Sequence, residues 1–105
     1  MAETIYNKLV RDKIPEIIKK ANKTPVTYIA SELEAVERLY DKLGEEFEEF
    51  KLTPTAEELA DILEVIDGIA AAFDLNMDTV QSVKTAKYTE RGGFTMRIIL
   101  DRVID

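Results

Sequence analysis

Apolar residues recur every three or four positions over two long stretches of the chain, which is the spacing of one helix face. The first stretch covers about 31–51 and the second about 55–73. Ser31 opens a capping-box pattern at the start of the first helix, and Thr53 or Thr55 caps the second. The short break between the stretches predicts an antiparallel helix hairpin whose apolar faces meet.

Weaker patterns flank this hairpin. A short helix is expected over about 14–21, and a more polar one over about 77–90, ending before Gly92. Residues 26–30 alternate and are rich in β-branched and aromatic side chains, which is consistent with a short strand. The tail could pair with it over about 97–103 as a two-stranded ribbon or form a last helical turn. The pattern therefore predicts an all-α helical bundle built on a hairpin, with the ribbon as an open alternative.

Composition narrows the class of protein. The 105 residues suit one domain, 1–105, and 46% hydrophobic content is enough for a core. A net charge of -7 argues against nucleic acid or a membrane surface as a partner. No apolar run resembles a signal peptide or a membrane span, so we expect a cytoplasmic protein. With no Cys and no His, any chemistry must use carboxylates, Lys, Arg, Tyr and hydroxyls.

Two pairs of acidic residues occupy equivalent positions on the long helices. On a helical wheel, Glu46 and Glu49 flank the apolar stripe of the first, and Glu58 and Asp61 flank that of the second. In an antiparallel hairpin these flanks share one side, so the four carboxylates should converge. Four anions at the edge of a core need a cation to neutralise them. Oxygen-only ligands favour a hard ion, Mg²⁺ above all, with Mn²⁺ as a substitute.

Other features of these helices allow different interpretations. Acidic helix faces are usually solvated, and Glu58 can act as the capping-box acid of Thr55. Glu64 and Asp67 form a second E-x-x-D pair, but they lie away from the apolar stripe and are expected to be solvated, with Glu64 nearer to a supporting role. The flank beyond the acids is small or apolar, which predicts a surface that packs on another helix or a partner subunit. Its residues are Val65, Gly68 and Ala72.

Several segments resemble a known family. "KLGEEFEEF" followed by "EELADILEVI" resembles the EExxE and ExxD elements of the MazG-like, all-α nucleotide pyrophosphohydrolases. The opening "YNKLVRDKIPEII" and the late "ERGGF" resemble a small bacterial and archaeal subgroup related to phosphoribosyl-ATP pyrophosphohydrolase. Only eight residues separate Glu49 from Glu58, fewer than in many members; Glu64 and Asp67 would restore the usual gap, but the wheel favours Glu58 and Asp61.

The resemblance implies a function and roles for individual residues. It implies Mg²⁺-dependent hydrolysis of a nucleoside triphosphate between its α and β phosphates, as house-cleaning of non-standard or excess nucleotides. Glu46, Glu49, Glu58 and Asp61 match the metal ligands of the family, and Glu45 matches the first acid of EExxE. Without histidine, Glu45 or one of the ligands must accept the proton of the attacking water.

Cations must also meet the substrate phosphates. The candidates are Lys8, Arg11, Lys13, Lys87 and Arg91. The resemblance further implies a homodimer or higher oligomer. Two alternatives stay open: phosphoribosyl-ATP pyrophosphohydrolase of histidine biosynthesis, and a non-catalytic acidic helical module that dimerises or binds a partner protein.

Overall fold

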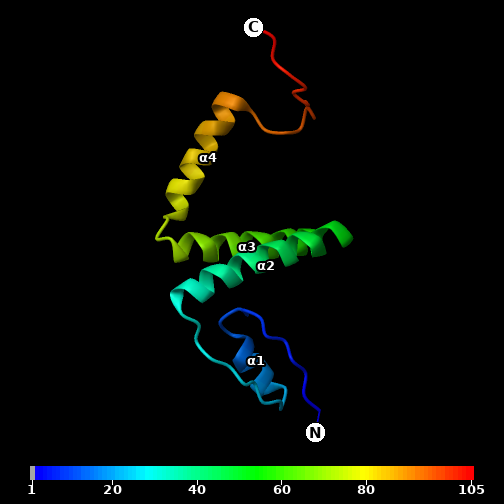
Figure 1. The fold of residues 1–105 in the computed structure, drawn as a ribbon, viewed down its shortest axis with the longest axis vertical. Helices are drawn as coiled ribbons and strands as arrows, with labels where there is room; N and C mark the ends of the chain where they lie inside the picture. Colours follow the sequence, from blue (N-terminus) through cyan, green and yellow to red (C-terminus); the bar gives the residue numbers. More distant parts are fainter. Residues whose placement is uncertain (1) are drawn as a thin grey trace. The chain divides into compact units, whose positions relative to one another are not determined.

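The computed structural model describes residues 2–105, and it is all-α (Figure 1). Its elements are α1 (Ile14–Lys20), α2 (Glu32–Leu52), α3 (Ala56–Ala72) and α4 (Met77–Arg91). The chain divides into two compact units, one ending at Asp74 and the other spanning Leu75–Asp105. The expectation of a single domain stays a prediction. In the described part of the chain, no helix is both long and apolar enough to cross a membrane.

The ends of the long helices follow from their capping residues. The Ser31 hydroxyl accepts a hydrogen bond from the Glu34 N–H at 3.2 Å, as the capping-box pattern predicts. Thr55 accepts from the Glu58 N–H at 3.3 Å, so Thr55 and not Thr53 caps α3. At the end of α4, Gly92 adopts φ +80°, a left-handed conformation that glycine accepts without a Cβ clash.

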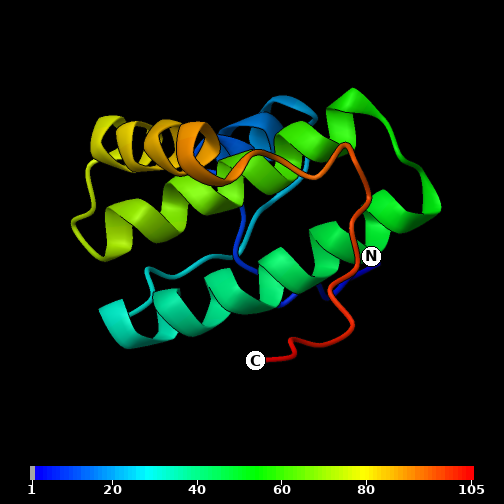
Figure 2. The same ribbon diagram turned by 90° about the horizontal axis from the view of Figure 1, so that it is seen from above.

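α2 and α3 lie side by side and antiparallel, joined by a short connection (Figures 1 and 2). Val65 of α3 is buried, and a Cβ on Gly68 would lie 3.0 Å from Leu39 Cδ2. Of the flank predicted to pack on another helix, Val65 is buried and Gly68 lies against α2, whereas Ala72 is exposed. We call this contact, centred on Leu39, Glu46, Val65 and Gly68, the α2–α3 seam. Glycine at position 68 lets the two helices approach closely there.

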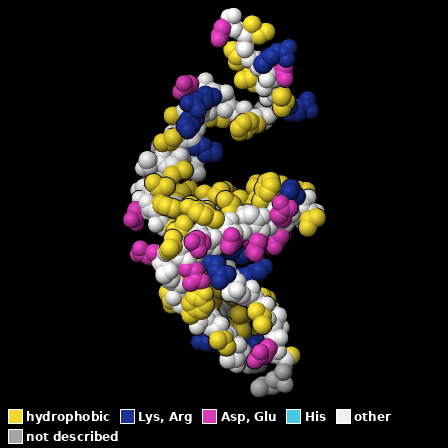
Figure 3. All heavy atoms as spheres, in the orientation of Figure 1, with side chains coloured by type: hydrophobic (Ala, Val, Ile, Leu, Met, Phe, Trp, Pro, Cys, Tyr) yellow, Lys and Arg dark blue, Asp and Glu magenta, His cyan; other side chains and the backbone are white. Residues whose placement is uncertain are grey.

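The large apolar side chains of the two helices cover each other only in part, and others of the predicted stripe, such as Leu39 and Ile62, are half-buried. Seven of the large apolar side chains are between 36% and 70% exposed and form what we call the apolar face: Leu33, Tyr40 and Phe47 of α2, and Leu59, Leu63, Ile66 and Phe73 of α3. Figure 3 shows apolar side chains along one side of the hairpin and acidic ones along the other. The reason is geometric, because one neighbouring helix cannot cover an apolar arc roughly 120° wide.

Two irregular segments are fixed to α2 by hydrogen bonds. Arg38 donates to the backbone oxygen of Asn7 at 2.7 Å and to its Oδ1 at 3.0 Å. Tyr28 donates from its hydroxyl to Glu34 at 2.5 Å, and this hydrogen bond, with the charge of Glu34, raises the pKa of the tyrosine. These contacts hold residues 2–13, the N-terminal segment, and the connection before α2 against the same helix.

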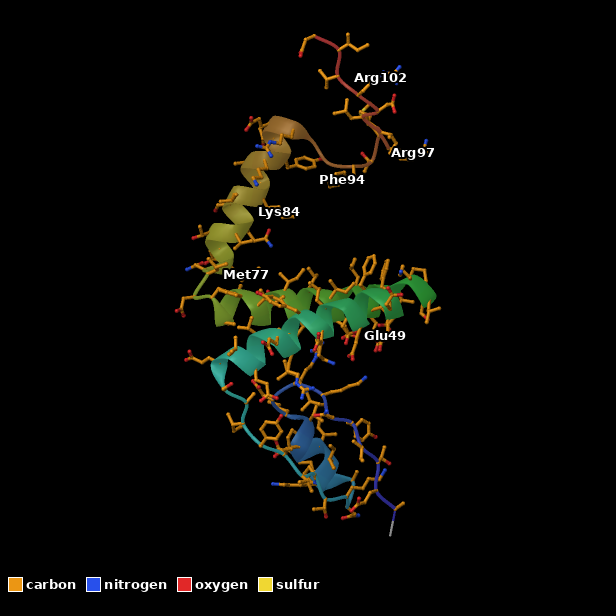
Figure 4. All side chains as sticks on the ribbon, viewed as in Figure 1. Glu49, Met77, Lys84, Phe94, Arg97 and Arg102 are labelled. Carbon is orange, nitrogen blue, oxygen red and sulfur yellow. The ribbon has the colours of Figure 1, made fainter. Side chains whose placement is uncertain are left out.

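The two-stranded ribbon does not form. Within residues 2–105 neither 26–30 nor 97–103 is a strand. Val26 and Ile29 are almost fully exposed, and the first of these segments is held by its tyrosine instead of by backbone pairing. The tail is interrupted by a turn in which the Arg97 N–H bonds the Phe94 oxygen at 3.1 Å with φ +58° at Arg97. Figure 4 labels both residues of this turn.

A matched pair of glycine substitutions tests the seam. Gly68→Val places carbon atoms against Leu39 and should lower the free energy of unfolding by about 1–3 kcal/mol. Gly44→Val on α2 meets nothing within 4 Å and should change it by no more than about 0.5 kcal/mol. Urea unfolding followed by circular dichroism measures both, and equal stabilities would contradict the close approach at Gly68.

Candidate metal centre

Three of the four predicted ligands come together beside the hairpin connection. Glu46 of α2 and Glu58 and Asp61 of α3 each offer one carboxylate oxygen, and these oxygens all lie within 4.8 Å of one another. We call these three residues the carboxylate cluster. The helix register explains their meeting, because Leu39 lies seven residues before Glu46 and its seam neighbour Gly68 lies seven residues after Asp61. This arrangement can hold a metal ion.

Burial distinguishes the cluster from an ordinary acidic helix face. Glu46 is only 8% exposed, and the Oε2 atoms of Glu46 and Glu58 are buried without a hydrogen-bond partner among residues 2–105. Lys42 is the nearest cation to Glu46, with Nζ 3.6 Å from its Oε1. A buried carboxylate oxygen with no partner costs free energy. A cation between the carboxylates would remove that cost, so the donor set fits a hard divalent ion.

The electrostatics of the cluster agree with its geometry. Burial, followed by the charge of Glu49, raises the pKa of Glu46, while Lys42 acts in the opposite direction. Burial and the charges of Glu49 and Asp61 raise the pKa of Glu58. Both carboxyl groups therefore hold their protons more tightly than in water, first because burial disfavours the charged form and second because neighbouring anions repel it.

Glu49 occupies a different place from the other three predicted ligands. It is exposed on α2, one helical turn beyond Glu46, and lies outside the group of oxygens that approach within 4.8 Å. Its charge nevertheless acts on both Glu46 and Glu58. Figure 4 shows it projecting from α2 near the hairpin connection. Glu49 is thus placed at the open edge of the cluster.

The N-terminal segment brings one predicted substrate-binding cation, Arg11, to the cluster and a second, Lys8, to the neighbouring Glu45. Arg11 donates from Nη2 to Asp61 Oδ1 at 2.8 Å, and Lys8 Nζ lies 3.5 Å from Glu45 Oε1. These side chains are about half exposed, so each ion pair contributes little to stability. Glu45, the candidate proton acceptor, is half-buried next to Glu46.

The other three predicted cations lie elsewhere. Lys13 is the N-cap residue of α1. Lys87 and Arg91 lie in the last part of α4, in the second unit, one helical turn apart.

A hollow of about 240 Å³ opens beside the cluster. Its walls are residues 9–12 of the N-terminal segment and the facing surfaces of α2 and α3, and it includes Glu46 and Asp61. Lys42 also lines it, although the pattern analysis gave this residue no role in the site. The sequence could have identified Lys42, because it lies four residues before Glu46, a spacing that places both side chains on one helix face. Glu64 and Asp67 are both exposed, as expected, and of the two only Glu64 lines the hollow.

Metal binding should be visible as thermal stabilisation. Adding Mg²⁺ or Mn²⁺ in place of NaCl at equal ionic strength should raise Tm, and saturation at about 100 times Kd corresponds to about 2.7 kcal/mol. Glu46→Gln should abolish most of this increase because it removes the charge of a ligand. Glu48→Gln, an exposed glutamate of the same helix, is the matched control and should respond as the wild type does. A full Mg²⁺ response in Glu46→Gln would exclude Glu46 as a ligand.

Comparison with protein-family models, with curated proteins and with solved structures finds no match to this chain. The assignment of the site therefore depends on its own geometry and on the sequence motifs.

Proposed function

We propose that the chain is a Mg²⁺-dependent nucleoside triphosphate pyrophosphohydrolase, which cleaves between the α and β phosphates and releases a nucleoside monophosphate and pyrophosphate. The observation that carries the proposal is the carboxylate cluster with its two buried, unpartnered oxygens. The resemblance to the MazG-like family supports it. House-cleaning of non-standard or excess nucleotides in the cytoplasm is the role that we propose for this activity.

The residues of the cluster would hold the ion between α2 and α3. Glu46, Glu58 and Asp61 are its proposed ligands, and Glu49 at the open edge would complete the set. When bound, Mg²⁺ neutralises charge on the phosphate oxygens. Mn²⁺ is expected to substitute because it accepts the same oxygen donors.

The chain's own residues would then carry the proton and the substrate charge. The oxygen of a water molecule forms a bond with the α phosphorus, the bond to the bridging oxygen breaks, and pyrophosphate leaves. Glu45 is our proposed acceptor of the water's proton, and one of the ligand carboxylates is the alternative. Arg11 pairs with Asp61 of the cluster and Lys8 pairs with the adjacent Glu45, and both would turn to the phosphates. Lys13, Lys87 and Arg91 are the remaining proposed phosphate contacts.

Pyrophosphate release from a panel of nucleoside triphosphates and phosphoribosyl-ATP tests the reaction. We expect Mg²⁺-dependent release with several triphosphates, and a decrease in kcat of about 100-fold or more in Asp61→Asn, since the ion's charge stabilisation amounts to several kcal/mol. Asp67→Asn is the matched control on the exposed side of α3. Activity with phosphoribosyl-ATP alone would identify the biosynthetic enzyme, and none with any substrate would favour the non-catalytic module. Full activity in Asp61→Asn would exclude its ligand role.

The proposal includes a homodimer formed through the apolar face. This face spans both α2 and α3, and its large side chains are 36–70% exposed. A second copy presents the same two-helix face, so hairpin against hairpin gives a self-complementary four-helix bundle. α4 is a single, more polar helix and is narrower than the face. A second copy therefore matches the width of the face better than any other helix of the chain.

A charge placed in the apolar face tests the dimer. Leu63 is 57% exposed, and Leu63→Asp should raise the Kd of the dimer by about 30-fold or more, which corresponds to the loss of one interface hot spot. Asp67→Asn is the control. Sedimentation equilibrium measures both variants. A wild-type monomer, or a Leu63→Asp protein that dimerises as tightly as the wild type, would contradict the use of this face and favour coverage by the chain's own second unit.

A further inference from the structure

We propose that the hollow beside the carboxylate cluster binds the base and ribose of the nucleotide substrate, with Glu64 as a hydrogen-bond acceptor at its edge. The inference rests on the proposed function, in which the phosphates lie at the cluster. It adds a location for the base and the ribose. It is carried by the position of the hollow, its size and the chemistry of its walls.

Position connects the hollow to the cluster. Glu46 and Asp61 belong both to the cluster and to the wall of the hollow. A molecule that fills the hollow therefore lies directly beside an ion held by these carboxylates. Arg11 and Lys42, which lie against Asp61 and Glu46, line the same space. Phosphates at the cluster would thus lie next to two cations, and the base and ribose would occupy the rest of the hollow.

Size and wall chemistry indicate what the hollow accepts. Its volume of about 240 Å³ is below the range of about 300–1,000 Å³ that is usual for complete drug-sized ligands. It therefore suits part of a nucleotide better than a whole triphosphate. Leu9 and Val10 of the N-terminal segment and Leu39 and Val65 of the two helices supply apolar surface to the walls of the hollow. Such walls accept the faces of a heterocyclic ring.

Glu64 is one of six charged residues that line the hollow; the other five are Arg11, Asp12, Lys42, Glu46 and Asp61. Glu64 lies one helical turn after Asp61 and forms no ion pair or hydrogen bond with any residue in the described range 2–105. Its carboxylate is therefore available to accept hydrogen bonds, either from the N–H groups of a base or from ribose hydroxyls. Inorganic polyphosphate offers neither group. This difference separates binding of a nucleoside from binding of phosphate alone.

Two variants and two probes test the inference. Binding of a non-hydrolysable α,β-methylene nucleoside triphosphate and of tripolyphosphate would be measured by calorimetry in Mg²⁺. Val10→Phe fills the hollow and should weaken nucleotide binding by about 10-fold or more, with tripolyphosphate binding unchanged. Val26→Phe is the control, because Val26 is 95% exposed and lies outside the hollow. Glu64→Gln changes no wall volume and should weaken only the nucleotide.

The outcomes separate this inference from the proposed function. In one outcome the wild type binds both probes, and Val10→Phe and Glu64→Gln bind the nucleotide as tightly as the wild type does. The hollow is then not the nucleoside site, although the result remains consistent with a metal-dependent phosphate site. Equal weakening of both probes would likewise overturn the inference and assign the hollow to the phosphate chain. If the wild type binds neither probe, the proposed function fails with it. An unchanged Mg²⁺-induced increase in Tm verifies that each variant keeps the cluster.

Discussion

The structure of the first unit depends on the burial of acidic side chains where two helices meet. Glu46 is almost completely buried in the α2–α3 seam, and an oxygen of Glu46 and one of Glu58 have no partner within the described chain. A seam that only stabilised the hairpin would place apolar side chains there, because an uncompensated buried carboxylate is costly. The burial of Glu46 is therefore better explained by a site that can hold a cation than by packing alone. Burial and the neighbouring carboxylates raise the pKa of Glu46 and of Glu58, and a bound cation would oppose this shift.

The same hairpin separates two kinds of surface. Its seam is narrow and includes Gly68 against Leu39, so the helices approach closely and the carboxylates of facing turns come within reach of one ion. Its wide apolar face is left exposed on another side (Figure 3). The N-terminal segment then brings Lys8 and Arg11 to the acidic side, fixed by the hydrogen bonds of Arg38 to Asn7. The acidic site, the contacts of the basic N-terminal segment and the hollow all depend on the register of α2 against α3.

Much of this arrangement follows from local sequence. The helix ends were predictable because Ser31 and Thr55 bond the first backbone N–H groups of their own helices, which requires no distant contact. The convergence of Glu46, Glu58 and Asp61 was also predictable, because spacing on a helix and a short connection together determine which flanks face each other. For the same reason the all-α fold was predictable from periodicity alone.

Features that depend on contacts between distant segments were decided only by the tertiary structure. The sequence pattern could not specify how far the two apolar arcs cover each other; the structure leaves seven of the large apolar side chains exposed and brings Leu39 against Gly68. The pattern also did not predict the ion pairs of Lys8 and Arg11, because these depend on where the N-terminal segment crosses α2 and α3. The pair of Lys42 with Glu46 at the site was missed as well. The sequence by itself determined the helices and which acids share a flank. Only packing decided which carboxylates are buried and where the hollow opens, because burial depends on neighbours that local spacing does not specify.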